Sequence, residues 1–545
     1  MTTKKWVYRF GEEASEGHSD MKDLLGNKGA NLAEMAAIGL PVPPGFTITT
    51  DACRDFLENQ HQVREEIRQQ IQSGISWLEE VSGRGFGDPS KPLLVSVRSG
   101  AAQSMPGMMD SVLNLGLNDE AVALLLEKTT SKRFILDCYR RVIEMYGSVV
   151  FGVDEQLFDE IIHEFRTEQG LNKDNGVSGA GWSVLIERYK SSILEETGLE
   201  YPQNIEDQLY STIGAVFRSW YSPRAISFRA IQGMEDAGGT AVTVQLMVYG
   251  NRSEQSASGV AFTRDPSTGE PGLFGEFLPR VQGEDIVGGF HSPRALSEKA
   301  RIARGDNVSS LQTSMPQQFS ELEAIAKKLE ARFRDMQQIE FTIDEGKLWL
   351  LQTRTAKRTI EVAVRIALDL FDEGLITQKE AIEHVPLQGF RRLTHPVIDP
   401  DFKVEVITRG LPASPGAASG KLVFLSEDAV ALANKGLSAI LVRNETSPND
   451  VEGMHAAKAI LTRRGGMTSH AADIARAIGR PCIVDARFIQ LDLQQKTMKV
   501  AGQVVHAGDE ITIDGSNGVV LAGVVPMRTP KLDEYGERFK ALLTS

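Results

Sequence analysis

The chain has 545 residues, of which 41% are hydrophobic and 24% charged, and its formal net charge is -14. This length is typical of about two to four domains, and the acidic balance argues against a nucleic-acid-binding surface. Neither an apolar leader nor an uninterrupted apolar run of about 18 residues is present, so we expect neither export nor a membrane span. Three widely spaced cysteines predict no disulfide framework and no metal cluster, which indicates a cytoplasmic protein.

The first informative segment is a glycine turn at Gly26 that carries Lys28. Helix-forming residues continue from this turn to about Gly39, and a strand is predicted over Phe46 to Thr50. A lysine in such a turn can lie over phosphate groups. Most lysines of short glycine turns are simply solvated, so both interpretations stay open at this point.

An alternating strand is predicted over Leu93 to Gly100, and we expect it to deliver Arg98 at its end. A Gly- and Pro-containing loop follows from Ser104 to Asp110. An arginine beside such a loop can hold a phosphate with two parallel hydrogen bonds. A surface salt bridge is an equally good explanation of the pattern.

The middle of the chain changes character twice. From about 119 to 210 the pattern is helical and rich in charge, which predicts a helical insertion that shapes a cleft. Strands are then predicted over 241–249 and 260–266, with a Ser- and Gly-containing loop at 250–259 between them. That loop can either fold over a triphosphate or serve as an ordinary connection.

A hairpin is predicted over Ile339 to Arg354, with its turn near Gly346. Pairing centred there would set Glu340 opposite Gln352, and the period of two puts Gln352 and Arg354 on one face. A carboxylate, an amide and an arginine on one face can hold Mg²⁺ and phosphate together. The pattern alone describes a half-exposed hairpin.

The last third begins with helices over 357–387, and strands and helices then alternate from about 410 onward. This alternation predicts a compact α/β unit. Within it, Gly465 and Gly466 precede a short helix that ends at Gly479, and Cys482 follows as part of a core strand.

His470 lies at or just before the start of this short helix. The free N–H groups and dipole of a helix start favour a phosphoryl group, and the hydroxyls of Thr468 and Ser469 can donate to it. An imidazole with an unperturbed pKa of about 6.5 is largely neutral near pH 7 and can act as a nucleophile. For a lone histidine, simple capping or packing at the helix start is the more common role.

These segments together resemble the pyruvate phosphate dikinase family and its relatives, the phosphoenolpyruvate synthases, whose phosphohistidine falls on His470. The resemblance implies an α/β (α+β) chain in which an ATP-grasp nucleotide-binding domain with a helical insertion precedes a mobile α/β phosphohistidine domain. The expected parts are the ATP-grasp domain at 1–118 and 211–357, the insertion at 119–210, a helical linker at 358–403, the phosphohistidine domain at 404–524 and a C-terminal tail at 525–545.

The resemblance also implies the site residues. Catalysis would involve His470 with Gly466, Thr468 and Ser469 around it. The ATP-binding residues would be Lys28, Arg98, Glu284, Gln352 and Arg354. Mg²⁺ would be the cofactor, held by Glu340 and Gln352.

The implied function is that of an ATP-dependent phosphotransferase in which Mg·ATP phosphorylates His470 and AMP is the nucleotide product. The terminal phosphate would go to inorganic phosphate or to water. The family's third module, a (β/α)₈ barrel that binds pyruvate or phosphoenolpyruvate, has no counterpart here, so we expect pyruvate or another small acceptor on a separate barrel-domain chain or missing domain. A homodimer is left open.

Several positions depart from the family pattern and support an alternative, a catalytically weakened ATP-binding regulatory or partner-docking protein. Gln338 replaces an acidic residue near Glu340, and Ala102 replaces an arginine. Ser253 and Ala257 replace glycines, and a non-glycine residue at positive φ costs about 1 kcal/mol or more, whereas Asn27 replaces a glycine but tolerates left-handed geometry.

Asp473 is a further departure, because relatives have an apolar residue at this position. Three residues after His470 on the helix, it could orient the imidazole or repel a phosphoryl group. It could also simply be an acidic residue that favours the first helical turn.

Overall fold

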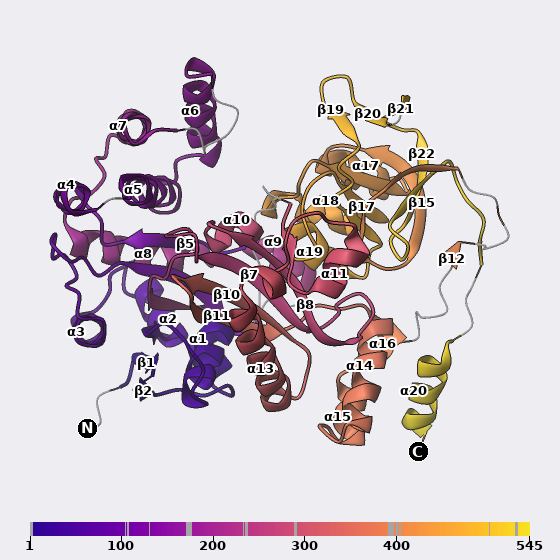
Figure 1. The fold of residues 1–545 in the computed structure, drawn as a ribbon, viewed down its shortest axis with the longest axis horizontal. Coiled ribbons are helices and arrows are strands. Elements are labelled where there is room, and N and C mark those ends of the chain that lie inside the picture. The colour runs from indigo at the N-terminus through magenta and orange to yellow at the C-terminus, as the bar shows by residue number, and fades with distance from the viewer. Residues whose placement is uncertain are drawn as a thin grey trace. The chain divides into compact units, whose positions relative to one another are not determined.

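The computed structural model is described in two compact units, the first formed by Met1–Val248 with Trp349–Gln352 and the second by Tyr249–Leu348 with Thr353–Ser545 (Figure 1). The residues that the structure describes are 4–12, 14–103, 105, 108–129, 131–170, 177–232, 234, 238–287, 292–390, 397–398, 402, 405–500, 502–528 and 532–544. Ser104, Pro106 and Gly107 of the loop expected after Arg98 therefore lie outside the described residues.

The first unit is built on an antiparallel six-stranded sheet in the order β2-β1-β3-β6-β4-β5. Its strands are β1 (Val7–Gly11), β2 (Ala14–Ser15), β3 (Gly45–Ile48), β4 (Val95–Ala101), β5 (Ser111–Leu115) and β6 (Thr240–Leu246). The strand expected to reach Thr50 ends at Ile48, because Thr49 caps the next helix by accepting a hydrogen bond from the N–H of Ala52.

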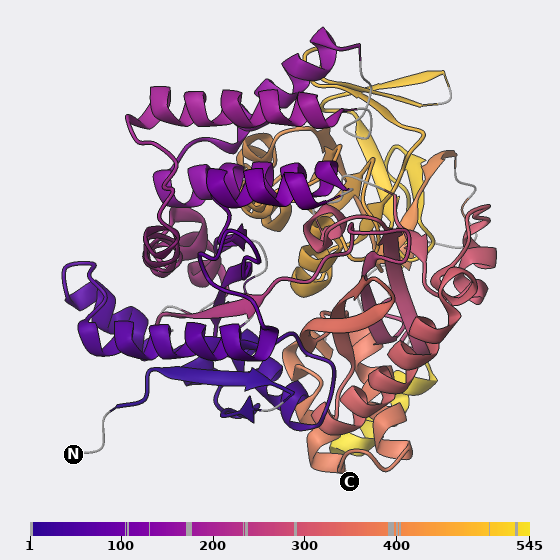
Figure 2. The same ribbon diagram turned by 60° about the vertical axis from the view of Figure 1, so that its left-hand side comes forward.

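Helices supply the rest of the first unit, and between β5 and β6 the described residues contain helices but no strand (Figure 2). The helices are α1 (Lys22–Ala37), α2 (Thr50–Glu58), α3 (Glu65–Ser82), α4 (Asp119–Lys128), α5 (Lys132–Tyr146), η1 (Gly147–Phe151), α6 (Glu155–Glu168), α7 (Gly179–Thr197), α8 (Ile205–Ser219) and α9 (Pro223–Gln232). The expected helices within 119–210 are thus present, whereas the domain boundaries drawn from the resemblance stay predictions.

The second unit contains a five-stranded sheet in the order β11-β10-β7-β8-β9, to which β11 contributes residues from both units. Its strands are β7 (Ala257–Arg264), β8 (Pro271–Pro279), β9 (Arg294–Ala295), β10 (Gln337–Asp344) and β11 (Lys347–Thr355). The two-residue turn between β10 and β11 is Glu345–Gly346, both at positive φ, which is the conformation that matches the twist of a hairpin.

The predicted hairpin is therefore confirmed, but its half-exposed character is wrong. Ile339, Phe341 and Ile343 are buried, and on the opposite side of β10 Gln338 and Thr342 are buried as well. An alternating pattern shows one apolar face, and it says nothing of whether the polar face is covered.

A second sheet of the same unit has eight strands in the order β13-β23-β22-β15-β16-β17-β18-β14. These are β13 (Val406–Arg409), β14 (Leu411–Ser414), β15 (Ala417–Val423), β16 (Ala439–Arg443), β17 (Ala459–Thr462), β18 (Cys482–Val484), β22 (Glu510–Asp514) and β23 (Val519–Ala522). Strands β15, β16, β17 and β18 run parallel and are joined by α17 (Ser426–Asn434), α18 (Val451–Ala456) and α19 (His470–Ile478). The expected compact α/β unit is confirmed.

Shorter elements complete the second unit. They are α10 (Gly283–Val287), α11 (Glu298–Arg304), α12 (Leu311–Ser314), α13 (Pro316–Phe333), α14 (Ile360–Asp372), α15 (Gln378–Glu383), α16 (Leu387–Phe390), β12 (Val397–Ile398), η3 (Pro448–Asp450), β19 (Gln490–Asp492), β20 (Thr497–Val500), β21 (Gln503–His506), β24 (Met527–Arg528) and α20 (Glu534–Thr544). The segment expected to be a tail forms α20, whose Phe539 packs against Phe390 at a ring distance of 5.0 Å.

Cys53, Cys138 and Cys482 are free and buried. Cys482 lies in β18 as expected of a core residue, and burial raises the pKa of its thiol to about 12. Among the described residues no helix has the length and apolar character needed to cross a membrane.

Candidate active site

His470 is the first residue of α19 and follows β17 by a short loop. Polar residues at the ends of neighbouring strands converge here: η3 follows β16, and α17 follows β15. Since β15, β16 and β17 are parallel, their carboxyl ends share one edge of the sheet, the usual place for ligands in such α/β folds. The predicted helix start at His470 and stop at Gly479, which has φ 64°, are both confirmed.

Two glycines shape the loop before the helix. Gly465 has φ 104°, which disfavours any L side chain. A Cβ on Gly466 would collide with the carboxylate of Glu276 on β8. Glycines at 465 and 466 therefore allow the turn and the close approach that bring His470 to the strand edge.

The imidazole of His470 is held on one side only. The main-chain carbonyl of Ser447 accepts a hydrogen bond from it, whereas Nε2 is buried and has no hydrogen-bond partner among the described residues. A hydrogen bond from Nδ1–H to this carbonyl would leave the lone pair on Nε2. Burial lowers the pKa of His470, and the carboxylates of Asp473 and Asp450 offset this only in part. The ring is neutral at pH 7 and its free nitrogen is nucleophilic.

A second polar group at this helix start also lacks a partner. Ser469, the residue before α19, is 5% exposed, and its Oγ has no hydrogen-bond partner among the described residues. Buried polar atoms are normally hydrogen-bonded. An unsatisfied hydroxyl beside an unsatisfied Nε2, at a helix start, fits a bound phosphoryl group.

The predicted residue Thr468 has a partner that sequence reasoning missed. Its Oγ1 lies 3.3 Å from Oε2 of Glu276, and Arg304 forms an ion pair with the same carboxylate at 3.0 Å. Glu276 is fully buried. A charged residue between the apolar neighbours of a strand was the available signal, because such a carboxylate needs a partner when buried.

Asp473 does not turn its charge to solvent, as a first-turn acidic residue would. It is 4% exposed and forms an ion pair of 3.3 Å with Arg354 on β11. Burial raises the pKa of Asp473, but the charges of Arg354, Arg476 and Lys357 outweigh it, so the carboxyl has a pKa below its usual value. The sequence alternatives for Asp473 did not include this pair.

In the first unit, Lys28 and Arg98 lie near one another. A Cβ on Gly100, two residues after Arg98, would be 3.4 Å from Cβ of Lys28, and Arg98 donates to the carbonyl of Leu351 at 3.3 Å. Gly26 has φ 67° and lies against Gly100, which brings the turn to the strand. The strand predicted over Leu93 to Gly100 is confirmed as β4 (Val95–Ala101), and Arg98 lies three residues before its end.

The remaining predicted residues are distributed as follows. Glu284 lies on α10 and Glu340 on β10, both in the second unit and both partly exposed. Gln352 and Arg354 are buried neighbours on β11, but Gln352 belongs to the first unit and Arg354 to the second. The expected pairing of Glu340 with Gln352 stays a prediction.

The donors around Glu340 fit Mg²⁺. Gln338, two residues earlier on β10, is 4% exposed, and its Oε1 has no hydrogen-bond partner among the described residues. Within the same described part, no group of three or more His, Cys, Asp or Glu could hold a metal. One carboxylate with amide oxygens suits Mg²⁺, which takes few protein ligands and is completed by phosphates and water.

The replaced glycines carry no backbone penalty. Asn27, Ser253 and Ala257 are not among the residues at positive φ, and Ala257 belongs to β7 rather than to the loop before it. The expected strain at Ser253 and Ala257 is therefore wrong, because the chain here does not use the left-handed conformation, and Asn27 does not adopt it either.

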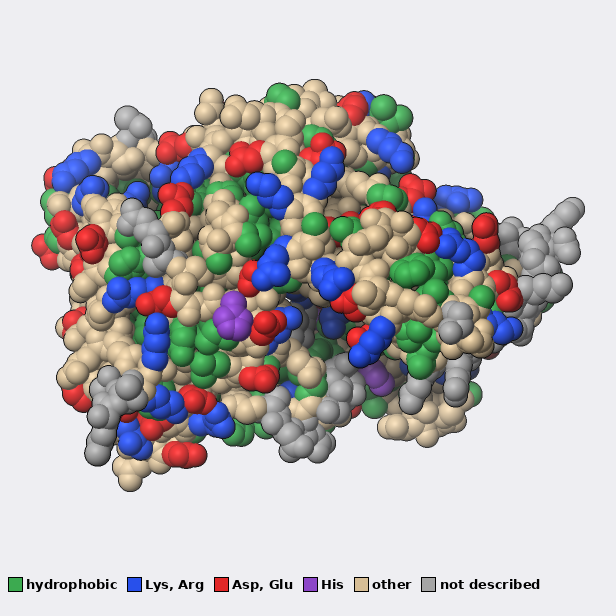
Figure 3. Space-filling view, turned by 90° about the horizontal axis from the view of Figure 1, so that it is seen from below, with side chains coloured by type: hydrophobic (Ala, Val, Ile, Leu, Met, Phe, Trp, Pro, Cys, Tyr) green, Lys and Arg blue, Asp and Glu red, His purple; other side chains and the backbone are tan. Residues whose placement is uncertain are grey.

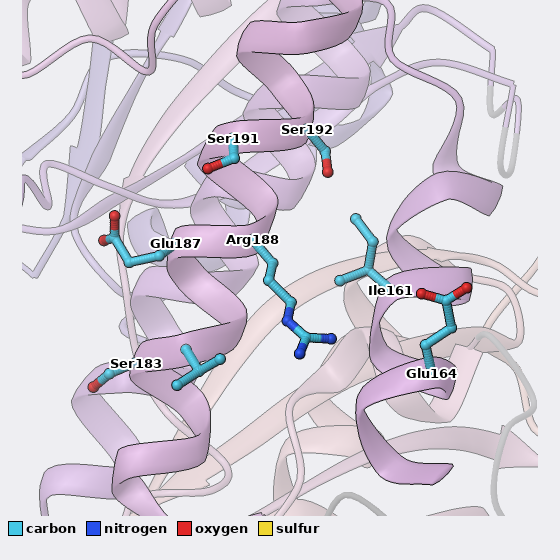
Figure 4. A pocket seen from close by; sticks show the side chains of 8 residues that line it. Ile161, Glu164, Ser183, Glu187, Arg188, Ser191 and Ser192 are labelled. Carbon is cyan, nitrogen blue, oxygen red and sulfur yellow. The ribbon is translucent and has the colours of Figure 1, made fainter. Parts of the chain in front are cut away.

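Neither of two other surface features competes as a site. A pocket of 640 Å³ between α6 and α7 contains Arg188 (Figure 4). This side chain is paired with Glu168 at 2.7 Å. On the face seen in Figure 3, the described acidic and basic side chains are interspersed and form no broad field of one sign. Nucleic acid is not favoured by such a surface.

The fold and the site define a chain with an ATP-grasp nucleotide-binding module followed by a phosphohistidine module. The family model "Pyruvate phosphate dikinase, AMP/ATP-binding domain" matches residues 22–85 and 76–374, and "PEP-utilising enzyme, mobile domain" matches residues 437–518. The chain belongs to the pyruvate phosphate dikinase family.

Curated relatives agree over nearly the whole chain. The pyruvate, phosphate dikinase of Rhizobium meliloti (strain 1021) is 52% identical over 534 residues, covering 98% of this chain and 60% of the relative. That of Clostridium symbiosum is 47% identical with the same coverages, and the chloroplastic enzyme of Flaveria pringlei is 47% identical, covering 99% of this chain and 55% of the relative. The chain thus spans a little over half the length of these relatives.

Proposed function

We propose that this chain is an ATP-dependent phosphotransferase of the dikinase type, in which His470 is phosphorylated. The observation that supports this most directly is the pair of buried, unpartnered polar atoms at the start of α19, Nε2 of His470 and Oγ of Ser469. A neutral imidazole whose Nδ1–H is already engaged offers Nε2 as the attacking atom.

In the proposed step the lone pair of Nε2 forms a bond to the β-phosphorus of ATP. The bond from that phosphorus to the oxygen bridging it to the α-phosphorus breaks, and AMP leaves with the electron pair. The γ-phosphoryl group is then transferred to inorganic phosphate or to water, and phosphohistidine remains. Ser469 and Thr468 would donate to the phosphoryl oxygens, and Gly466 would allow their approach.

The proposed roles of the residues that would bind ATP follow from the charge of each side chain. Lys28, Arg98 and Arg354 would neutralise the phosphates, Gln352 would donate to them, and Glu284 would contact the nucleotide. Glu340, with Gln352 and the amide oxygen of Gln338, would hold Mg²⁺. When bound, the ion supplies positive charge that offsets the charge of the transferring group.

The acceptor is proposed from the names of the relatives, which contain pyruvate and phosphate. We propose pyruvate or another small acceptor, bound by a separate barrel-domain chain or by a domain outside this sequence. A cytoplasmic location and a homodimer remain proposals as well.

A regulatory or partner-docking protein is the second candidate. It is favoured by Arg354, a proposed phosphate ligand, being paired with Asp473, and by the neutral Gln338.

One experiment separates these functions: the full chain is incubated with Mg²⁺ and ATP labelled with ³²P at the β-phosphate. Acid-labile, alkali-stable label on the protein, with release of AMP, is expected for the transferase. Nucleotide binding without label or AMP would contradict the transferase and support the regulatory protein.

A further inference from the structure

The loop after β16 contains a buried carboxylate that the reaction outlined above does not use. Asp450 is 4% exposed and ends η3. Its Oδ2 accepts from the backbone N–H of Ser447 at 2.9 Å and from the hydroxyl of Ser447 at 3.2 Å. In return, the backbone N–H of Asp450 donates to the carbonyl of Ser447 at 3.0 Å. Three hydrogen bonds to Asp450 therefore fix the position of Ser447.

The other oxygen of Asp450 anchors this arrangement to the two neighbouring strands. Oδ1 accepts from the hydroxyl of Ser426, at the start of α17, at 2.7 Å, and lies 3.2 Å from the guanidinium of Arg443 at the end of β16. Arg443 also donates to the carbonyl of Phe424 at 3.0 Å. A buried carboxylate with this many partners has little freedom to move.

The residue that Asp450 fixes is the one that holds His470. The carbonyl of Ser447 accepts the hydrogen bond of the imidazole, so its position decides which nitrogen carries the proton. In free histidine the proton prefers Nε2, the nitrogen that has to be bare for attack. The protein must therefore stabilise the other tautomer.

We propose that Asp450 is a positioning residue, which through Ser447 holds the proton of His470 on Nδ1 and so directs the phosphoryl group to Nε2. This inference rests on the proposed function for its catalytic meaning, but the tautomer itself is a property of the protein without ATP. The chain of contacts has a physical parallel in metal sites, where the partner of the second histidine nitrogen fixes the ring and its tautomer.

The first test needs no nucleotide. The full chain is labelled with ¹⁵N in its histidines, and the signals of His470 are identified by their loss in His470→Gln. We expect a protonated Nδ1 and a bare Nε2 in the natural protein, and in Asp450→Asn a shift of the proton toward Nε2. Ser426→Ala is the matched control, because it removes a hydrogen bond from the same carboxylate without touching Ser447, and it should leave the tautomer unchanged.

Unchanged signals of His470 in Asp450→Asn would overturn the proposal, as would an equal shift in Ser426→Ala. Asp450→Glu provides a second variant if the amide variant does not fold. The glutamate keeps the negative charge but places the carboxylate one methylene further from the backbone. We expect this variant, too, to shift the proton of His470 from Nδ1 toward Nε2.

The second test follows the chemistry with β-³²P-labelled ATP. We expect label only on Nε2 in the natural protein, and in Asp450→Asn a rate lower by about 10- to 100-fold with some label on Nδ1, while the affinity for ATP stays the same. A natural rate with label on Nε2 alone would contradict the proposal. If the natural protein takes no label, the proposed function fails while the tautomer result still stands.

Discussion

The surroundings of His470 and the residues proposed to hold ATP are organised in opposite ways. The groups that act on the imidazole, the carbonyl of Ser447 and the carboxylates of Asp450 and Asp473, lie after two adjacent parallel strands, β16 and β17. The seven proposed nucleotide and metal residues are divided between the units, with Lys28, Arg98 and Gln352 in the first and Glu284, Gln338, Glu340 and Arg354 in the second. The histidine is thus prepared locally, whereas the nucleotide residues depend on separate parts of the chain.

The largest expected effect separates these two regions. His470→Ala should abolish labelling by β-³²P ATP, because no other group supplies the nucleophile, and should leave ATP binding nearly intact. His455→Ala is the control, since His455 lies on α18 in the same module and should not reduce labelling. Labelling and calorimetric ATP binding measure the two quantities, and an equal loss of both would contradict the division.

Substitutions of Arg354 test the residues proposed to bind ATP. Arg354→Ala should slow labelling by roughly 100-fold, as expected on removal of one charged donor to the reacting group. Arg354→Lys should lose less, since a point charge replaces the planar fork only in part. Arg358→Ala removes a nearby buried charge that pairs with Asp335, and it should have little effect. A natural rate in Arg354→Ala would remove this residue from the site.

The ion pair of Arg354 with Asp473 joins the two regions. Asp473→Asn should strengthen ATP binding about tenfold, because the carboxylate of Asp473 no longer competes with the nucleotide for Arg354. Asp335→Asn is the matched control, as it breaks a buried pair of Arg358 instead. Titration calorimetry with Mg·ATP gives both affinities, and an unchanged or weaker affinity in Asp473→Asn would show that the pair does not compete with the nucleotide.

A substitution of Gln338 tests the proposed Mg²⁺ site. An aspartate adds a carboxylate ligand and a negative charge beside Glu340, so Gln338→Asp should lower the Mg²⁺ concentration for half-maximal labelling several-fold. A Mg²⁺ titration of single-turnover labelling in both proteins measures this. The same or a higher midpoint in the variant would mean that the site is adapted to the amide.

The smallest expected effect is the lowering of the pKa of His470. Burial lowers the pKa of His470, while Asp473 and Asp450 act in the opposite direction, so the ring should gain its proton only below its ordinary value of about 6.5. The neutral form that attacks is then retained on mild acidification and lost as the pH falls further. A nuclear magnetic resonance titration of His470, identified with His470→Gln, measures this, and a midpoint above 6.5 would be inconsistent with the burial.

The sequence predicted the features that depend on residues close together in the chain. The glycines before His470 and the stop at Gly479 define a helix start within a few residues, and the turn at Gly346 defines a hairpin. It did not predict contacts that require the packed fold. Thr468 and Glu276 are 192 residues apart, and Arg98 and Leu351, whose carbonyl accepts a hydrogen bond from it, are 253 residues apart.

Ser447 was missed for a similar reason. It lies in a Pro-containing turn whose sequence indicates a helix start, and its carbonyl gains a role only because β16 and β17 are adjacent and parallel. The local pattern around Asp473 could not reveal its partner either, since Arg354 is 119 residues away in the sequence. Only the packed arrangement gives this charge a partner.

The guanidinium of Arg354 takes part in two equilibria, the binding of an anion and the ion pair with Asp473 on α19. Where an anion and Asp473 compete for Arg354, the factor by which the pair weakens binding of the anion is also the factor by which the anion weakens the contact of α19 with β11. The two events are reciprocal. A nucleotide that binds at Arg354 would therefore itself shift the population toward molecules in which the histidine helix is released.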